Sequence, residues 1–218
     1  MCKLIFLFIF PILLWASEAK ENIINGNLEI TKNQEIKRNN IIEFQLGTND
    51  YTGNRGKLFK SQQPSYGLSY KREFNQTYRV GINGRFSRSD TFIDAPTEGR
   101  LSALGFIDQS SFEIYTALEY RIFKLENMEA FIGLDLGYLI EKISYTDQPG
   151  LSDDSSGGPL TGLRLNLEYA LTEKYFMGLT GRYAINFLDN KNTNFFDPIV
   201  SDLSGQSISI SLNFGLKI

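Results

Sequence analysis

The chain closes on the stretch SISISLNFGLKI, residues 207–218, in which apolar and polar residues alternate without a break. Successive side chains of an extended strand point to opposite faces, so this segment has one apolar face and one polar face. The apolar face carries Ile208, Ile210, Leu212, Phe214, Leu216 and Ile218. Such alternation predicts a β-strand. It occurs both in soluble sheets and in strands that face lipid, so the rest of the chain has to distinguish the two.

The same period of two recurs along the chain and predicts about eight strands. The earlier segments that show it are IIEFQLGTN, SYGLSYKREF, YRVGINGRFSR, FEIYTALEYRI, AFIGLDLGYLIE, GLRLNLEYAL and YFMGLTGRYAINF. Each is close to the ~10 residues that a tilted membrane strand needs. One residue departs from the pattern, because Arg72 falls on the apolar face of its segment.

The connections between these segments alternate in length. Short ones, roughly NQT, KLENME and TEK, alternate with long polar stretches at 50–63, 89–110, 144–159 and 188–204. Short turns at one rim and long loops at the other are typical of membrane barrels.

The N-terminus indicates export. It has Lys3, an apolar run over residues 4–14, and small residues at Ala16 and Ala19, which is typical of a secretory signal peptide. A membrane anchor is the alternative, but the run is shorter than the ~20 residues of a spanning helix. We therefore expect a cleaved signal peptide at 1–16, with cleavage after Ala16 or Ala19 left open, a flexible polar leader at 17–40 and a barrel domain at 41–218.

The polar face of the predicted strands is rich in charge and in glycine. In a closed barrel of eight strands this face lines an interior just wide enough for side chains. Opposite charges have to pair there, because an unpaired buried charge is costly. We predict an ion-paired network in the lumen that includes Arg85, Glu119, Asp135, Arg164, Glu168 and Arg182.

The ending NFGLKI resembles the C-terminal assembly signal of outer-membrane proteins. Asn213, Phe214, Gly215 and Ile218 occupy the matching positions, although most such proteins end on Phe. From residue 41 onward the chain resembles the small eight-stranded outer-membrane barrels of the OmpA and OmpX type, often grouped as porin-family or opacity-like proteins.

That resemblance implies an all-β fold, an eight-stranded antiparallel up-and-down transmembrane β-barrel in the bacterial outer membrane. It also implies partners: the barrel assembly machinery, which reads the last strand by edge pairing, and outer-membrane lipid and lipopolysaccharide. A secreted lipocalin or a soluble sandwich is the structural alternative. A lipocalin would carry a Gly-x-Trp motif in its first strand, whereas the only tryptophan, Trp15, lies in the signal peptide.

The composition excludes most catalytic chemistry. Barrel enzymes generally use a histidine for proton transfer, and this chain has none. Carboxylates such as Glu113, Glu119 and Asp135 could exchange protons, but pairing with lumen arginines explains them better. The acidic loop SDDSSGG lacks the spacing of a calcium loop, and a net charge of −3 gives no reason to expect nucleic acid. We expect no enzyme activity, no cofactor and no metal.

Two functions remain open at this point. The first is a monomeric, non-enzymatic barrel in envelope integrity or surface interaction, whose long loops contact lipopolysaccharide, an extracellular ligand or a host surface. The second is a narrow porin that passes ions or small solutes through the lumen. About eight strands favour the first, because such a barrel has little free interior.

Overall fold

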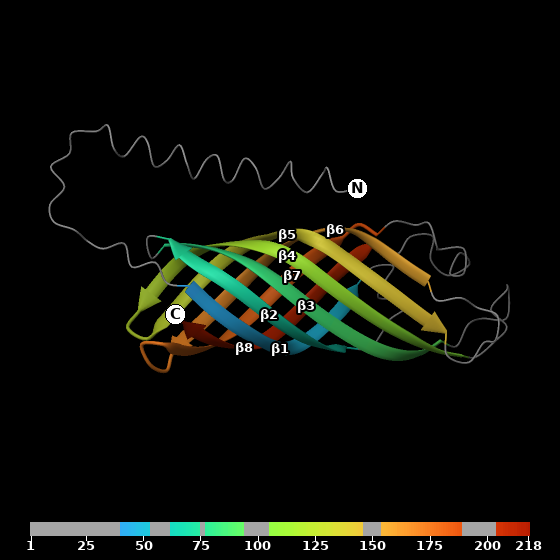
Figure 1. Cartoon of the computed structure of the whole chain (residues 1–218), viewed down its shortest axis with the longest axis horizontal. Coiled ribbons are helices and arrows are strands. Elements are labelled where there is room, and N and C mark those ends of the chain that lie inside the picture. The colour runs from blue at the N-terminus through green and yellow to red at the C-terminus, as the bar shows by residue number, and fades with distance from the viewer. Residues whose placement is uncertain (1–39, 53–61, 75–76, 94–104, 146–153, 189–203) are drawn as a thin grey trace, which may run out of the picture. The chain divides into compact units, whose positions relative to one another are not determined.

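The computed structural model describes residues 40–52, 62–74, 77–93, 105–145, 154–188 and 204–218, which form one closed barrel of eight strands (Figure 1). The strands are β1 (Asn40–Thr52), β2 (Gln63–Phe74), β3 (Tyr78–Ile93), β4 (Gly105–Leu125), β5 (Met128–Tyr145), β6 (Asp154–Ala170), β7 (Tyr175–Asn186) and β8 (Gly205–Lys217). Within these residues no helix is long and apolar enough to cross a membrane.

Every strand pairs antiparallel with its neighbour in sequence, and β1 pairs with β8 to close the barrel. The closing seam is continuous from Ile41 opposite Lys217 to Thr52 opposite Gln206. Closure removes the unpaired strand edge that an open sheet would leave there. The predicted fold, an eight-stranded antiparallel up-and-down barrel, is confirmed.

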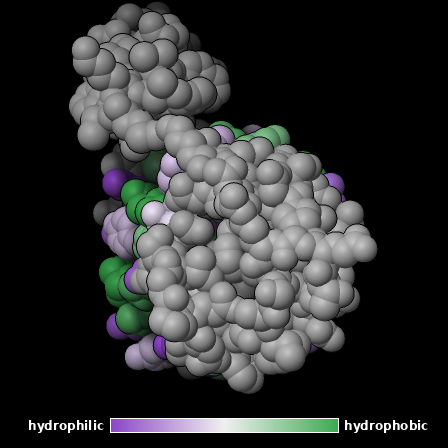
Figure 2. Space-filling view, turned by 90° about the vertical axis from the view of Figure 1, so that its right-hand side faces the viewer, coloured by the Kyte–Doolittle hydropathy of each residue, from purple (hydrophilic) through white to green (hydrophobic). Residues whose placement is uncertain are grey.

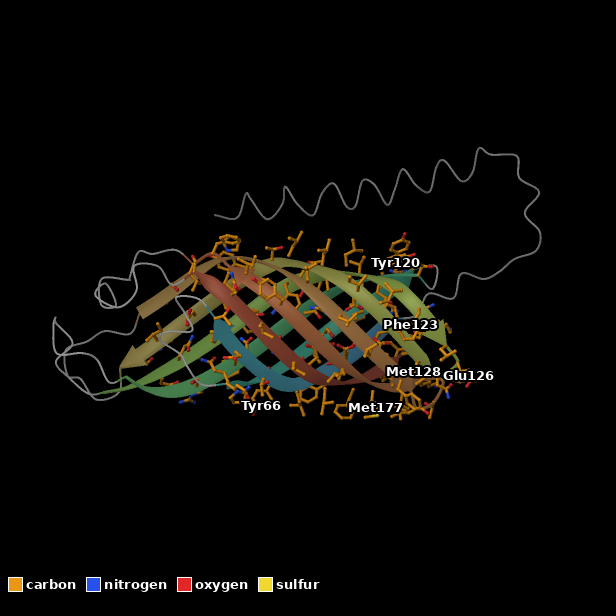
Figure 3. The ribbon with its side chains drawn as sticks, turned by 180° about the vertical axis from the view of Figure 1, so that it is seen from behind. Tyr66, Tyr120, Phe123, Glu126, Met128 and Met177 are labelled. Carbon is orange, nitrogen blue, oxygen red and sulfur yellow. The ribbon has the colours of Figure 1, made fainter. Side chains whose placement is uncertain are left out.

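The period of two separates the side chains into an apolar outer wall and a polar interior. Leu68, Ile82 and Leu136 point outward with about 60% of their surface exposed, whereas Glu43 and Asp135 are fully buried inside. Figure 3 shows Tyr66, Tyr120 and Met177 pointing away from the barrel. Hydrophobic side chains, drawn in green, are visible on the uncovered part of the outer wall in Figure 2. So large an apolar surface requires an apolar surrounding.

The connections alternate as predicted, with the short turns at one end of the barrel. Strands β4 and β5 are paired as far as Leu125 opposite Met128, so only Glu126 and Asn127 join them. This turn is shorter than the expected KLENME connection. A register shift between Arg121 and Phe123 accompanies it and turns both Ile122 and Phe123 outward. A bulge of this kind explains why alternation in the sequence misjudged the strand ends.

Four adjacent strands extend further toward the long loops than the sequence predicts. β3 pairs with β4 as far as Ile93 opposite Gly105, and β5 pairs with β6 as far as Ile143 opposite Asp154. The expected loops at 89–110 and 144–159 are therefore partly strand. Adjacent polar residues, as in Ser89 and Asp90 or in Asp108, Gln109 and Ser110, interrupt the alternation there, whereas backbone pairing does not depend on side-chain polarity. The alternation signal consequently fades before the backbone pairing ends.

Candidate functional site in the barrel lumen

Charged side chains fill the barrel interior. In the described residues eight acids and five bases are buried, and Arg121 is nearly so. These inward charges are Glu43, Lys71, Glu73, Arg79, Arg85, Glu113, Glu119, Arg121, Glu129, Asp135, Glu141, Arg164, Glu168 and Arg182. Burying so many charges is tolerable only if they are paired and hydrogen-bonded.

Seven of these residues form a continuous chain of ion pairs, here called the central network. Each member contacts the next in the order Glu43, Lys71, Glu119, Arg164, Asp135, Arg182 and Glu113. The first links are made by Lys71, whose Nζ lies 3.0 Å from a carboxylate oxygen of Glu43 and 3.0 Å from one of Glu119. Glu119 then accepts a hydrogen bond of 3.2 Å from Arg164.

Asp135 bridges the two arginines of the central network. Arg164 on β6 and Arg182 on β7 are direct cross-strand partners, an arrangement that places like charges side by side. Oδ2 of Asp135 accepts hydrogen bonds from Arg164 over 2.9 Å and from Arg182 over 2.6 Å. Arg182 also donates to Glu113 over 2.6 Å. The carboxylate of Asp135 therefore offsets the repulsion between these two arginines.

An aromatic ring completes the centre of the lumen. Tyr115 is buried, and the guanidinium carbons of Arg182 and Arg164 lie 4.3 and 5.1 Å from its ring centroid. A cation over an aromatic face is attracted by the ring quadrupole, more strongly where water is excluded. Tyr115 thus stabilises the same two cations that Asp135 binds.

Gly133 makes room for one link of the central network. A Cβ at this position would lie 2.9 Å from Cγ of Arg164 and 3.0 Å from Cγ of Glu119. Both residues are cross-strand partners of Gly133, one on each side. Their side chains cross above the glycine to reach each other, so the absence of a side chain there is what permits the contact.

The family assignment follows from comparison with known proteins. A family model described as outer membrane protein beta-barrel domain matches residues 28–215. The chain belongs to this family. Proteins of the family lie in the bacterial outer membrane and are generally not enzymes. No curated protein matches the chain at the sequence level.

Solved structures share the fold of this outer-membrane barrel. A major outer membrane protein from Thermus thermophilus is 10% identical with a TM-score of 0.59, covering 84% of this chain and all of its own. Neisserial surface protein A (NspA) is 13% identical with a TM-score of 0.53, covering 83% and 96% of the two chains. Ail of Yersinia pestis, solved with the heparin analogue sucrose octasulfate, is 13% identical with a TM-score of 0.50, covering 83% and 97%.

A second charged cluster lies between the central network and the short turns of the barrel. Arg79 donates to Glu168 over 2.6 Å and to Glu129 over 3.4 Å, and Arg121 is paired with Glu73 and Glu129. This turn-side cluster contains Glu168, which was predicted to belong to the same network as Asp135 and Arg182.

Phe131 is the apolar centre of the turn-side cluster. Its ring is fully buried, with the guanidinium carbons of Arg79 and Arg121 at 3.7 and 5.4 Å from the ring centroid. Sequence reasoning did not single it out. The available signal was its place in AFIGLDLGYLIE, where Phe131 falls out of phase with the outward apolar residues and therefore points into the lumen.

Arg85 lies apart from both groups, nearer the long loops. Its guanidinium donates to the hydroxyls of Ser209 and Ser65 over 2.6 and 2.7 Å and to the backbone oxygen of Thr48 over 3.3 Å. Glu113 is the cross-strand partner of Arg85 but is paired with Arg182. Of the predicted lumen residues, the structure therefore brings together Glu119, Asp135, Arg164 and Arg182 and leaves Arg85 and Glu168 elsewhere.

The predicted assembly signal lies at the end of β8 and just beyond it. Asn213 points inward and donates to Thr180 over 2.5 Å and to Asn166 over 3.2 Å, while Phe214 points outward. Gly215 packs tightly against the ring of Phe176. Ile218 exchanges two backbone hydrogen bonds with Asn40, so the last residue still belongs to the closing seam.

The described residues contain no group of three or more acidic, histidine or cysteine side chains arranged to hold a metal. The three carboxylates considered above for proton exchange, Glu113, Glu119 and Asp135, each lie within ion-pair distance of a cation. The acidic side chains of the loop SDDSSGG fall outside what the structure describes.

Proposed function

We propose that this protein is a non-enzymatic outer-membrane barrel with a closed, ion-paired lumen, and that it acts in envelope integrity or surface interaction through its long loops. The observation that carries the proposal is the central network. Its members come from β1, β2, β4, β5, β6 and β7, so the chain of ion pairs runs from one side of the barrel to the other.

A closed lumen follows from the size of the barrel together with this network. Eight strands enclose a space that side chains can fill. For an ion to pass, several buried pairs would have to separate, and each separation would leave a charge without its partner. The network therefore supports a rigid interior rather than an open channel.

The proposed absence of catalysis rests on residue chemistry. The chain has no histidine, and the carboxylates of the central network are engaged with arginine or lysine. Such engagement suits a structural role, because a general base needs access to a substrate proton.

Export and assembly complete the proposal. Residues 1–16 serve as a cleavable signal peptide, with Ala16 and Ala19 as the cleavage candidates, and the barrel assembly machinery recognises the final strand. The mature barrel is a monomer whose loops meet lipopolysaccharide and an extracellular ligand or host surface. N-terminal sequencing of protein purified from outer membranes would locate the cleavage point.

The deciding experiment is single-channel recording of the refolded barrel in a planar bilayer. We expect no regular current steps. Regular steps would overturn the closed lumen and favour the second candidate, a narrow porin. Because more acids than bases are buried in the lumen, such a pore should select cations. A pore that selects anions would contradict the closed lumen and this expected cation selectivity.

A further inference from the structure

Arg72 is a cation on the apolar outer wall. The burial pattern of β2 alternates so that Tyr70, Arg72 and Phe74 face away from the lumen, and Arg72 is half-buried there. Its cross-strand partners are Val80 on β3 and Asn40 on β1. A positive charge on the lipid-facing side of a barrel is unfavourable unless it reaches the polar interface or a counter-charge.

The described residues supply no counter-charge for Arg72. No carboxylate among them lies within 4.0 Å of its guanidinium, and its Nε is buried without a hydrogen-bond partner. The guanidinium carbon of Arg72 lies 5.7 Å from the ring centroid of Phe74. The cation therefore keeps unused donors, and its charge has to be balanced from outside this part of the chain.

Arg72 lies at the level where a membrane surface is expected. It is two residues from the end of β2 at the short turns. Outward aromatic residues surround this end, and the rings of Tyr78 and Tyr120 lie 5.2 Å apart. Figure 3 shows Tyr120 pointing away from the barrel. Aromatic girdles mark the boundary between acyl chains and headgroups, which places Arg72 beside the headgroups of the leaflet next to the turns.

A second polar group lies beside Arg72. Asn40 is its cross-strand partner, and within the described residues its side-chain amide makes no hydrogen bond, either at the acceptor Oδ1 or at the donor Nδ2. The backbone of Asn40 is already paired with Ile218, so only the side chain remains available. A guanidinium and an amide, each with unused hydrogen-bonding capacity, thus lie next to each other on the outer wall.

We propose that Arg72 and Asn40 form a binding site for the phosphodiester group of a phospholipid in the leaflet next to the short turns. The planar fork of an arginine binds phosphate oxygens through two parallel hydrogen bonds, and Nδ2 of the Asn40 amide can donate a third. The acyl chains lie along the outward apolar residues of the same strands, among them Ile42, Tyr70 and Ile82.

The outer wall favours a lipid over a second copy of the chain as the occupant. A second copy inserted in the same direction would present the same level of its wall to Arg72. Among the strand residues whose side chains the structure describes, the outward acids are Asp50 and Asp108, both toward the long loops, and the exposed acids at the other end, Glu126 and Glu173, lie in the turns beyond the strand ends. A lipid phosphate, in contrast, lies at the level of Arg72 all around the barrel. The site does not depend on whether the lumen conducts.

The test is native mass spectrometry of the full mature barrel refolded in vesicles of phosphatidylcholine with phosphatidylglycerol and extracted into a maltoside detergent. We expect the parent to retain phospholipid and Arg72→Gln to bind it roughly fivefold more weakly, as expected for one cation near a lipid surface. Arg72→Lys, which keeps the charge and loses the fork, should fall between them. Asn40→Ala should weaken retention to a smaller extent.

Two matched variants serve as controls. Arg88→Gln removes an outward arginine that is already paired with Asp108, and Lys124→Gln removes a cation near the short turns that is already paired with Glu129. Both should retain phospholipid like the parent. A heat-dependent shift in gel mobility confirms that each variant has folded. If Arg72→Gln fails to fold, Arg72→Lys and Asn40→Ala carry the comparison.

Four results would overturn the site. The first is a parent that retains no phospholipid, and the second is retention in Arg72→Gln equal to that of the parent. The third is displacement of the phospholipid by inorganic phosphate alone, because that would make the site one for a free anion. Dimers that disappear in Arg72→Gln would instead assign the surface to a second copy.

Discussion

Arg182 on β7 donates a hydrogen bond from Nε to Oδ2 of Asp135 on β5 over 2.6 Å, although β6 lies between the two strands. The contact passes through the lumen, where both side chains are buried. It joins strands that are not neighbours, so it constrains the barrel in a way that backbone pairing alone does not.

Replacing Arg182 with alanine should therefore destabilise the barrel strongly. The change removes the arginine that pairs with both Glu113 and Asp135, and Asp135 keeps one arginine instead of two. Removing one member of a buried pair costs about 3–5 kcal/mol. Urea unfolding in lipid vesicles, followed by circular dichroism, measures the free energy. The control Leu179→Ala, on the lipid-facing side of the same strand, should cost less, and equal losses would argue against the central network.

Gly133→Ala should disturb the link between Arg164 and Glu119. The new methyl group would lie within about 3 Å of both side chains and 2.9 Å from the backbone oxygen of Leu118. Overpacking of this kind typically costs about 1–3 kcal/mol. Gly181→Ala is the matched control, since a Cβ there would meet no atom within 4 Å. The midpoints of urea unfolding of the two variants measure the difference. Equal midpoints would show that the space above Gly133 is not needed for the contact.

Phe131→Ala should weaken the turn-side cluster. Loss of a fully buried ring leaves a cavity and removes the aromatic contact of Arg79 and Arg121. Large-to-small changes of buried phenylalanine cost about 3–5 kcal/mol. Phe44→Ala, on the lipid-facing wall, should cost less, as lipid can fill the vacated space. Calorimetric or urea-induced unfolding of both variants measures the difference. If Phe131→Ala lowers the free energy of unfolding no more than Phe44→Ala does, Phe131 does not stabilise the turn-side cluster.

Leu136→Arg tests the position of the membrane. Leu136 is among the most exposed apolar residues and lies in the middle of β5. An arginine deep in the bilayer costs about 2–4 kcal/mol, and one near the interface about 0–1 kcal/mol. The same change at Leu171, in the turn before β7, should be nearly neutral. The free energies of refolding in vesicles provide the measurement. If both variants lose the same free energy, Leu136 does not lie in the hydrocarbon core of the membrane.

Phe214→Asp tests the predicted assembly signal. Phe214 faces outward on the last strand, opposite Phe44 and Met177. We expect little of this variant in the outer membrane of cells, because the altered strand is recognised poorly and a lipid-facing charge is unfavourable. Quantitative immunoblots of membrane fractions measure the outcome. Phe214→Leu should insert normally. Normal membrane levels of Phe214→Asp would contradict the predicted assembly signal.

The sequence by itself determined which face each strand turns to the lipid. The side-chain period of a strand is two whatever the strand pairs with. Alternation therefore placed Leu68, Ile82 and Leu136 outside and Asp135 and Arg182 inside before any contact was known. The number of strands and the alternation of short and long connections followed from the same local signal.

The tertiary structure alone decided which lumen charges meet. Tilt and stagger of the strands set the height of each residue along the barrel axis, and this stagger is a property of the closed sheet rather than of any one strand. That is why Glu168 is paired with Arg79, and why Arg85 binds serine hydroxyls although Glu113 is its cross-strand partner. Period assigns a side chain to a face, but only closure of the barrel assigns it a partner.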